Sequence, residues 1–227
     1  MIIVMRSRSL RSSHPIRRIL PLFLLAACAT AAAVAADHEP PPAKDATSYP
    51  AVDVHAKEQV AIAAVPFDTP EQCKIFQVDY LKYDFLPIRI IVTNQGDRPI
   101  SLNDARIYFV DAAGDRIQAA EPEDVERRLT PPNGRNTGIP VGPVHLHLKK
   151  KDSDNKIEGD FDHFEYAAIA VEPHTTRAGF LFYDMKGLGD NPLHGASLVL
   201  RELRNADGQE LFFFQIPFDR YLAASKR

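Results

Sequence analysis

The chain has 227 residues, a formal net charge of −3 and two cysteines, Cys28 and Cys73. Five of its 27 basic residues are arginines within the first 36 positions, which leaves 22 basic against 30 acidic residues in the rest. This acidic balance argues against a nucleic-acid partner, because such binding needs clustered positive charge. Cys73 has no second cysteine beyond the first 36 residues, so we expect no reliance on a disulfide within the chain.

The first 36 residues have the layout of an export signal. A stretch with five arginines and no acidic residue comes first, and the apolar run 19–27 follows it directly. Ala33-Val34-Ala35 then supplies small residues at the spacing that signal peptidase reads. We therefore predict that residues 1–36 are a signal peptide and that the protein is exported.

A second processing site overlaps this signal. The sequence Leu25-Ala26-Ala27-Cys28 resembles a bacterial lipobox. The resemblance implies cleavage before Cys28, lipidation of its thiol and anchoring in the membrane of a bacterial cell envelope. Cleavage after Ala35 is the alternative, and it gives a soluble periplasmic or secreted protein. An uncleaved membrane anchor is a third reading, since the apolar stretch approaches the length of a bilayer span.

Residues 37–58 are predicted to be a tether. Three consecutive prolines at positions 40–42 favour extended polyproline geometry, and residues 44–48 have no hydrophobic period. A spacer of this kind holds a domain off a surface, so it favours the lipidated form of the protein.

The following sequence predicts one β domain over residues 59–222 and a C-terminal tail at 223–227. The first expected strands are residues 60–66, 74–80, 87–93, 106–111 and 115–118. Residues 87–93 are β-branched and uncharged apart from Arg89, so we expect a central strand there. The Asn-Gln-Gly-Asp sequence at 94–97 is typical of the turn that closes it.

One short helix and one long loop are expected next. Pro122 suits a first helical turn, and Arg127 and Arg128 suit a last turn before the prolines at 131–132. Residues 130–162 are rich in proline, glycine and mixed charge, which predicts a flexible loop. Because long loops on rigid sheets often carry binding, we expect this loop to contact a partner.

The remaining strands are expected at residues 165–171, 176–184, 197–203 and 210–217, the last two joined as a hairpin through residues 205–208. The last strand is apolar on nearly both faces, which predicts a central or helix-covered position. The aromatic residues expected in the core are Phe180, Phe182, Phe212 and Phe214.

Short strands separated by turn signals, without a βαβ rhythm, predict a mainly β fold, a single antiparallel immunoglobulin-like β-sandwich with one short helix and one long loop. Residues 90–100 and 178–184 resemble immunoglobulin-like domains of uncharacterised bacterial envelope proteins. The resemblance implies this fold and an extracytoplasmic setting, and it implies no activity.

The histidine pair His145 and His147 is the best candidate for a metal site. Residues two apart in a strand face the same side, so both imidazoles can bind one divalent metal ion. The alternative is a polar strand end beside an acidic surface loop. The acidic stretch that follows is not an EF-hand, because Lys156 and Glu158 occupy positions that need a ligand and a glycine. No other cofactor is predicted.

No motif for nucleophilic catalysis is recognised, and the glycines at 187 and 189 suggest only a connection between strands. The sequence therefore predicts a non-enzymatic exported cell-envelope protein, a tethered module that binds an unknown protein or envelope component. The alternative is a periplasmic protein that binds a metal or a small ligand through His145 and His147.

Overall fold

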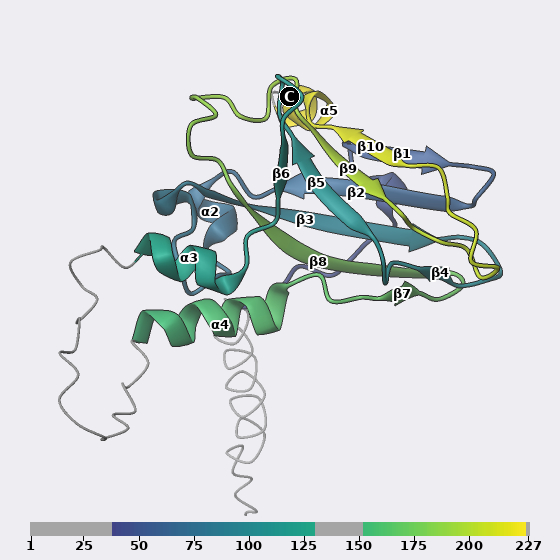
Figure 1. The fold of residues 1–227 in the computed structure, drawn as a ribbon, viewed down its shortest axis with the longest axis horizontal. Coiled ribbons are helices and arrows are strands. Elements are labelled where there is room, and N and C mark those ends of the chain that lie inside the picture. Colours follow the sequence, from purple (N-terminus) through teal and green to yellow (C-terminus); the bar gives the residue numbers. More distant parts are fainter. Residues whose placement is uncertain (1–37, 130–151, 226–227) are drawn as a thin grey trace, which may run out of the picture. The chain divides into compact units, whose positions relative to one another are not determined.

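The computed structural model describes residues 38–129 and 152–225, and within them the protein is mainly β with antiparallel sheets (Figure 1). The strands are β1 Val52–His55, β2 Val60–Pro66, β3 Phe85–Asn94, β4 Ile100–Ser101, β5 Arg106–Val110, β6 Arg116–Gln118, β7 Ala170–Val171, β8 Thr175–Asp184, β9 Ser197–Arg201 and β10 Phe214–Pro217. The helices are η2 Ala46–Ser48, α2 Pro70–Cys73, η3 Leu81–Tyr83, α3 Pro122–Leu129, α4 Asp152–Phe164 and α5 Asp219–Ser225, where η marks a 3₁₀ turn.

Two four-stranded sheets form the body of the domain. Their strand orders are β1-β2-β3-β8 and β10-β9-β5-β6, and β4 and β7 form a small separate pair. The inner faces share one hydrophobic core, in which Ile88 and Ile90 of β3 join Leu198 and Leu200 of β9. This arrangement is consistent with a β-sandwich.

Strand β3 is buried along its whole length, so the prediction of a central strand is confirmed. Antiparallel neighbours β2 and β8 satisfy its backbone on both sides. Arg89 lies buried on its outer face, where burial lowers the pKa of the guanidinium and one N–H group donates to the carbonyl of Pro41.

A layer of helices and turns covers the outer face of the β1-β2-β3-β8 sheet. In Figure 1, α3 and α4 lie alongside β8. Their side chains join a second, aromatic cluster: Phe76 packs edge-on against Phe164, Phe180 and Phe182, at centroid distances of 5.0, 5.1 and 5.5 Å. Such edge contacts suit the charge distribution of aromatic rings.

Both lateral seams between the sheets are closed. On one side Ala119 pairs with Tyr183, and the Ala120 N–H donates to the Phe182 carbonyl at 2.7 Å. On the other side the Gln215 N–H donates to the Asp53 carboxylate at 2.9 Å. These contacts cover strand edges that would otherwise be open to other chains.

The tether prediction for residues 37–58 is wrong over most of its length. Asp45 caps η2, the Ala46 N–H donates to Thr93 Oγ1 at 2.9 Å, and β1 pairs with β2. Small side chains explain the difference: Ala46 is fully buried against Ala61 and Ala63 of β2, a contact that larger residues would prevent. The domain therefore starts well before the predicted residue 59.

The flexible loop predicted over residues 130–162 is wrong for its last part, which belongs to α4. Ile157, Phe161 and Phe164 recur at helical spacing and are buried, although the acidic residues between them obscure the pattern. Residues 130–151 lie outside the described part, so a partner surface there stays a prediction. The helix expected at Pro122 is confirmed as α3.

Several smaller predictions also need correction. Residues 74–80 form turns instead of a strand, and of residues 165–171 only the last two are in a strand. The described residues contain four α-helices instead of one, and α5 extends into the predicted tail at 223–227. Strand β10 lies at a sheet edge, and Phe212 before it is 66% exposed, although Phe180, Phe182 and Phe214 are core residues as predicted.

Across residues 38–129 and 152–225, none of the helices combines the length and apolar character that a membrane crossing requires.

Candidate binding site

A pocket of about 640 Å³ opens at the end of the sandwich where β3 begins and β8 ends. We call it the end pocket. Its lining residues are Asp68, Leu81, Asp84, Leu86, Met185, Gly189, Asp190, Asn191, Pro192, Leu193, His194 and Leu222. This volume lies in the range that small-molecule sites occupy.

The floor of the end pocket is continuous with the main core. Leu86 and Leu193 are buried members of the core cluster, and Leu81, Met185 and Leu222 pack against it. The pocket therefore exposes apolar surface that belongs to the sandwich interior, which is favourable to cover with an apolar group.

Three chain segments shape the pocket walls. Asp84 ends η3 in the left-handed conformation at φ 63°, and its carbonyl accepts the Met185 N–H at 2.7 Å. The loop after β8 turns at Gly187 and Gly189, where positive φ angles favour glycine. Helix α5 forms the third wall, and its Tyr221 hydroxyl donates to Asp68 at 2.7 Å.

The ionisable side chains in the described lining of the end pocket are three aspartates and His194. The aspartates are Asp68, Asp84 and Asp190, and the described lining contains no lysine or arginine. Asp84 lies 3.9 Å from Arg128, so its charge is partly balanced. The Asp190 side chain is exposed and has no hydrogen bond or ion pair to the described residues.

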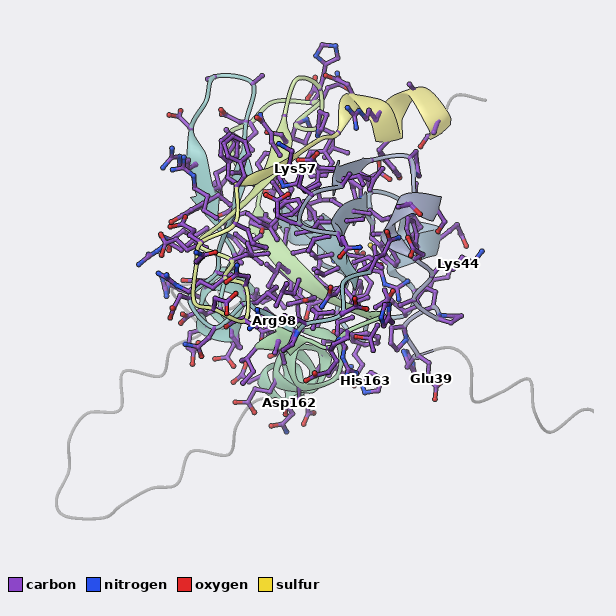
Figure 2. All side chains as sticks on the ribbon, turned by 90° about the vertical axis from the view of Figure 1, so that its right-hand side faces the viewer. Glu39, Lys44, Lys57, Arg98, Asp162 and His163 are labelled. Atoms are coloured by element: carbon purple, nitrogen blue, oxygen red, sulfur yellow. The ribbon has the colours of Figure 1, made fainter. Side chains whose placement is uncertain are left out.

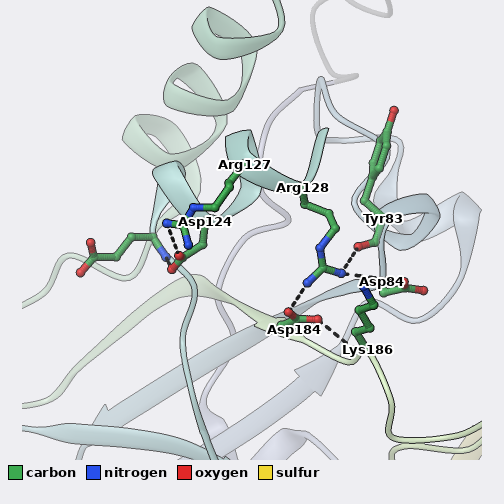
Figure 3. A network of polar contacts seen from close by, with 8 residues as sticks. Tyr83, Asp84, Asp124, Arg127, Arg128, Asp184 and Lys186 are labelled. Atoms are coloured by element: carbon green, nitrogen blue, oxygen red, sulfur yellow. Dashed lines mark hydrogen bonds and ion pairs between the residues drawn. The ribbon is translucent and has the colours of Figure 1, made fainter. Parts of the chain in front are cut away.

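A second pocket of about 650 Å³ lies on the other side of the β3–β8 end, beneath α3. Its arginines are paired with aspartates, Arg127 with Asp124 and Arg128 with Asp184. Figure 3 shows the Arg128 guanidinium between the Asp184 carboxylate and the Tyr83 carbonyl, and the same group lies over the Phe85 ring at 5.2 Å. Because the Arg128 contacts fasten α3 to the sheet, we assign this network a structural role.

Replacing Arg128 with alanine is expected to lower the free energy of unfolding by about 1–2 kcal/mol, since a charge-assisted contact is lost but solvent screens part of it. The Arg128 side chain is 25% exposed. Arg127 on the same helix is 63% exposed and bonds only Asp124 at 3.0 Å, so Arg127→Ala is a matched control with an expected loss below about 0.5 kcal/mol. Urea unfolding of both variants measures the difference, and equal losses would contradict the anchoring role.

The residues proposed from sequence for chemistry fall outside the described part. Cys28, His145 and His147 all lie there, so lipidation and the metal site stay predictions. Within the described ranges, no group of three or more histidine, cysteine or acidic side chains is arranged to hold a metal ion. Figure 2 shows Asp162 and His163 on the side of α4 that faces away from the sheets.

Cys73 is buried, as expected for a thiol without a partner. Its Sγ lies 3.2 Å from the Phe67 carbonyl, to which it donates, and burial raises the pKa of the thiol to about 12. The neutral thiol is a weak nucleophile, so this position packs as a small apolar side chain.

Sequence reasoning did not find the end pocket. The glycines at 187 and 189 suggest only a connection between strands, whereas their loop forms a pocket wall. The only signal was the length of this connection, because the pocket's other residues come from distant parts of the chain.

Comparison with protein-family descriptions, with curated proteins and with solved structures found no match. The class of the protein therefore rests on the molecule itself, a mainly β domain with antiparallel sheets and an apolar pocket at one end.

Proposed function

We propose that the protein is a non-enzymatic binding module that holds a partner protein or envelope component in the end pocket. The apolar floor, continuous with the core and open to solvent, is the observation that supports this role. A partner group that covers Leu81, Met185 and Leu222 would remove apolar surface from water. The proposal includes no catalytic step.

The pocket assignment is tested by photo-cross-linking in the native cells. A photoreactive phenylalanine analogue placed at Asn191, on the pocket rim, is expected to give one defined cross-linked product. The matched control is Ala206, which is exposed in the connection between β9 and β10, near Asn94 at the opposite end of β3. Equal products from both positions, or none from Asn191, would contradict the proposal.

We further propose that the protein is exported to a bacterial cell envelope and anchored through a lipid on Cys28. The lipobox-like sequence and the apolar run before it support this proposal. The described domain begins at His38, so nine residues separate it from Cys28. Nine fully extended residues reach at most about 30 Å, so the domain would lie close to the membrane surface.

Mass spectrometry of the mature N-terminus tests the anchor. We expect the mass of an S-diacylglyceryl group on Cys28, with or without a further acyl chain on its amino group, and the loss of this mass in the Cys28→Ala variant. A mature chain that begins at Ala36 would contradict lipidation and support soluble export.

We also propose that the sandwich is immunoglobulin-like. The sheet orders support this reading, because β2, β3 and β8 correspond to strands A, B and E, and β6, β5, β9 and β10 to C′, C, F and G. Strand β1 is an addition beside A, and no described strand takes the place of D. The end pocket then lies at the A–B and E–F end, opposite the B–C and F–G loops.

A further inference from the structure

We propose that the end pocket binds a basic side chain, lysine or arginine, that stands beside an apolar side chain in a segment of a partner protein. This inference rests on the proposed binding function and adds the chemistry of the bound group. The inference depends on the combination of acidic side chains and apolar surface around the opening of the end pocket.

The first argument is the balance of charge around the pocket. Three aspartates line the opening, and no lysine or arginine lies among its described lining residues. The neighbouring pocket shows the contrast, because there Asp124 and Asp184 are neutralised by Arg127 and Arg128. Of the three aspartates at the end pocket, only Asp84 lies near one of these arginines, with its carboxylate 3.9 Å from the Arg128 guanidinium. Among the described residues, Asp68 accepts only the Tyr221 hydroxyl, so Asp68 and Asp190 keep their negative charge.

The second argument is the distribution of polar and apolar groups. Leu86 and Leu193 lie at the floor, whereas Asp68 and Asp190 are exposed. Lysine and arginine match this order, since their aliphatic stems pack on apolar surface while their charged ends stay in water. The volume of about 640 Å³ also leaves room for an adjacent apolar side chain.

The third argument is long-range attraction. The chain after residue 36 has 22 basic against 30 acidic residues. An acidic molecule attracts basic partners and speeds their association, and aspartates at the opening direct the basic group there. An acidic or neutral partner gains nothing from this field.

The proposal is tested by titrating the purified full chain with three capped tripeptides while the leucine and methionine methyl signals are followed by NMR. The peptides are acetyl-Leu-Lys-Leu-amide and its counterparts with methionine or glutamate in the centre. We expect the lysine peptide to shift the signals of Met185 and Leu222. The glutamate peptide should bind at least about 10-fold more weakly, because its charge is repelled.

Two aspartate variants separate local from general charge effects. Asp190→Asn is expected to weaken binding of the lysine peptide about 2- to 5-fold, the upper range of one exposed ion pair. Asp162→Asn removes the same charge from the outward side of α4 and should change the affinity less than about 2-fold (Figure 2). Equal weakening by both variants would overturn the inference.

Each of the other outcomes of the titration also tests the inference. Equal affinity for all three peptides would overturn the cation preference but leave the pocket as a binding site. Absence of shifts with the lysine peptide would overturn the inference, while the cross-linking result from Asn191 would still test the binding function separately. Hexylammonium serves as a fourth ligand. If this free amine binds more tightly than the lysine peptide, the pocket binds a small amine instead of a protein segment, and the inference is overturned.

Discussion

Replacing Gly179 with alanine is expected to lower the free energy of unfolding by about 3 kcal/mol, the upper range for overpacking in a core. A Cβ atom on Gly179 would lie 2.5 Å from the Cα and 2.7 Å from the backbone nitrogen of Tyr166. Neither atom can move alone, because the Tyr166 N–H donates to the Phe180 carbonyl at 3.0 Å and Glu165 pairs with the same strand. The chain beside β8 would have to detach.

Gly159→Ala is the matched control for this substitution. The nearest atom to its added Cβ is Nε2 of Gln77 at 3.0 Å, the end of a flexible side chain. Gly159 lies inside α4, where alanine is favoured over glycine by about 1 kcal/mol, so we expect no loss or a small gain. Urea unfolding of both variants gives the answer, and a loss below about 1 kcal/mol for Gly179→Ala would refute the close approach.

Replacing Asp160 with alanine is expected to lower the free energy of unfolding by about 2–4 kcal/mol, because the N–H groups of Gln77 and Val78 would lose their acceptor. The Asp160 side chain is fully buried on α4. Its carboxylate accepts the Gln77 N–H at 2.9 and 3.0 Å and the Val78 N–H at 3.1 Å. Asp160→Asn keeps one acceptor oxygen, so its loss should be smaller. Equal losses in the two variants would show that these hydrogen bonds contribute little.

The same carboxyl group predicts a pH dependence. Burial raises the pKa of Asp160 above its ordinary value of 3.8, although the hydrogen bonds from Gln77 and Val78 oppose the shift. The folded state therefore binds this proton more tightly than the unfolded state. The contribution of Asp160 to stability is greatest below pH 3.8 and declines as the pH rises through the raised pKa. The difference in unfolding free energy between Asp160→Asn and the parent should shift in favour of the variant over this pH interval. A constant difference would contradict the raised pKa.

Much of the fold could be predicted where the signal is local. Strand β3 combines β-branched residues with a turn sequence, and in the structure Asn94 forms that turn by accepting the Gly96 N–H at 2.9 Å. Helix α3 carries its acidic and basic residues at the expected ends. The residues that predict β3 and α3 all lie within or directly beside these elements.

Other segments could not be predicted because distant residues decide their conformation. Phe76, Val78 and Tyr80 alternate like a strand and are buried. The backbone N–H groups of Gln77 and Val78 nevertheless donate to the side chain of Asp160, 83 positions beyond Gln77. Residues 46–51 look polar and unstructured, yet Ala46 is buried against Ala61 and Ala63 of β2, and Ala51 is buried in the main core. The period of hydrophobic residues alone therefore does not show that residues 74–80 form turns or that residues 46–51 pack into the domain.

The end pocket is the clearest example of this limit. Its residues come from the turn after β2, from η3, from the loop after β8 and from α5, so no single sequence motif predicts the pocket. The histidine pair, by contrast, was visible as a motif, but it lies outside the described residues. A motif of neighbouring residues is thus visible in the sequence, whereas a pocket that only the fold assembles is not.

The most direct test of the account is the position of the bound lysine tripeptide, measured by nuclear Overhauser effects between peptide and protein. The end pocket predicts contacts from the lysine methylene protons to methyl groups of Leu86, Leu193 and Leu222. The competing surface is the exposed Phe212 with the partly buried Phe213 beside it, whose rings lie 4.6 Å apart. Contacts to these rings, without any to the three leucines, would contradict the end pocket as the binding site.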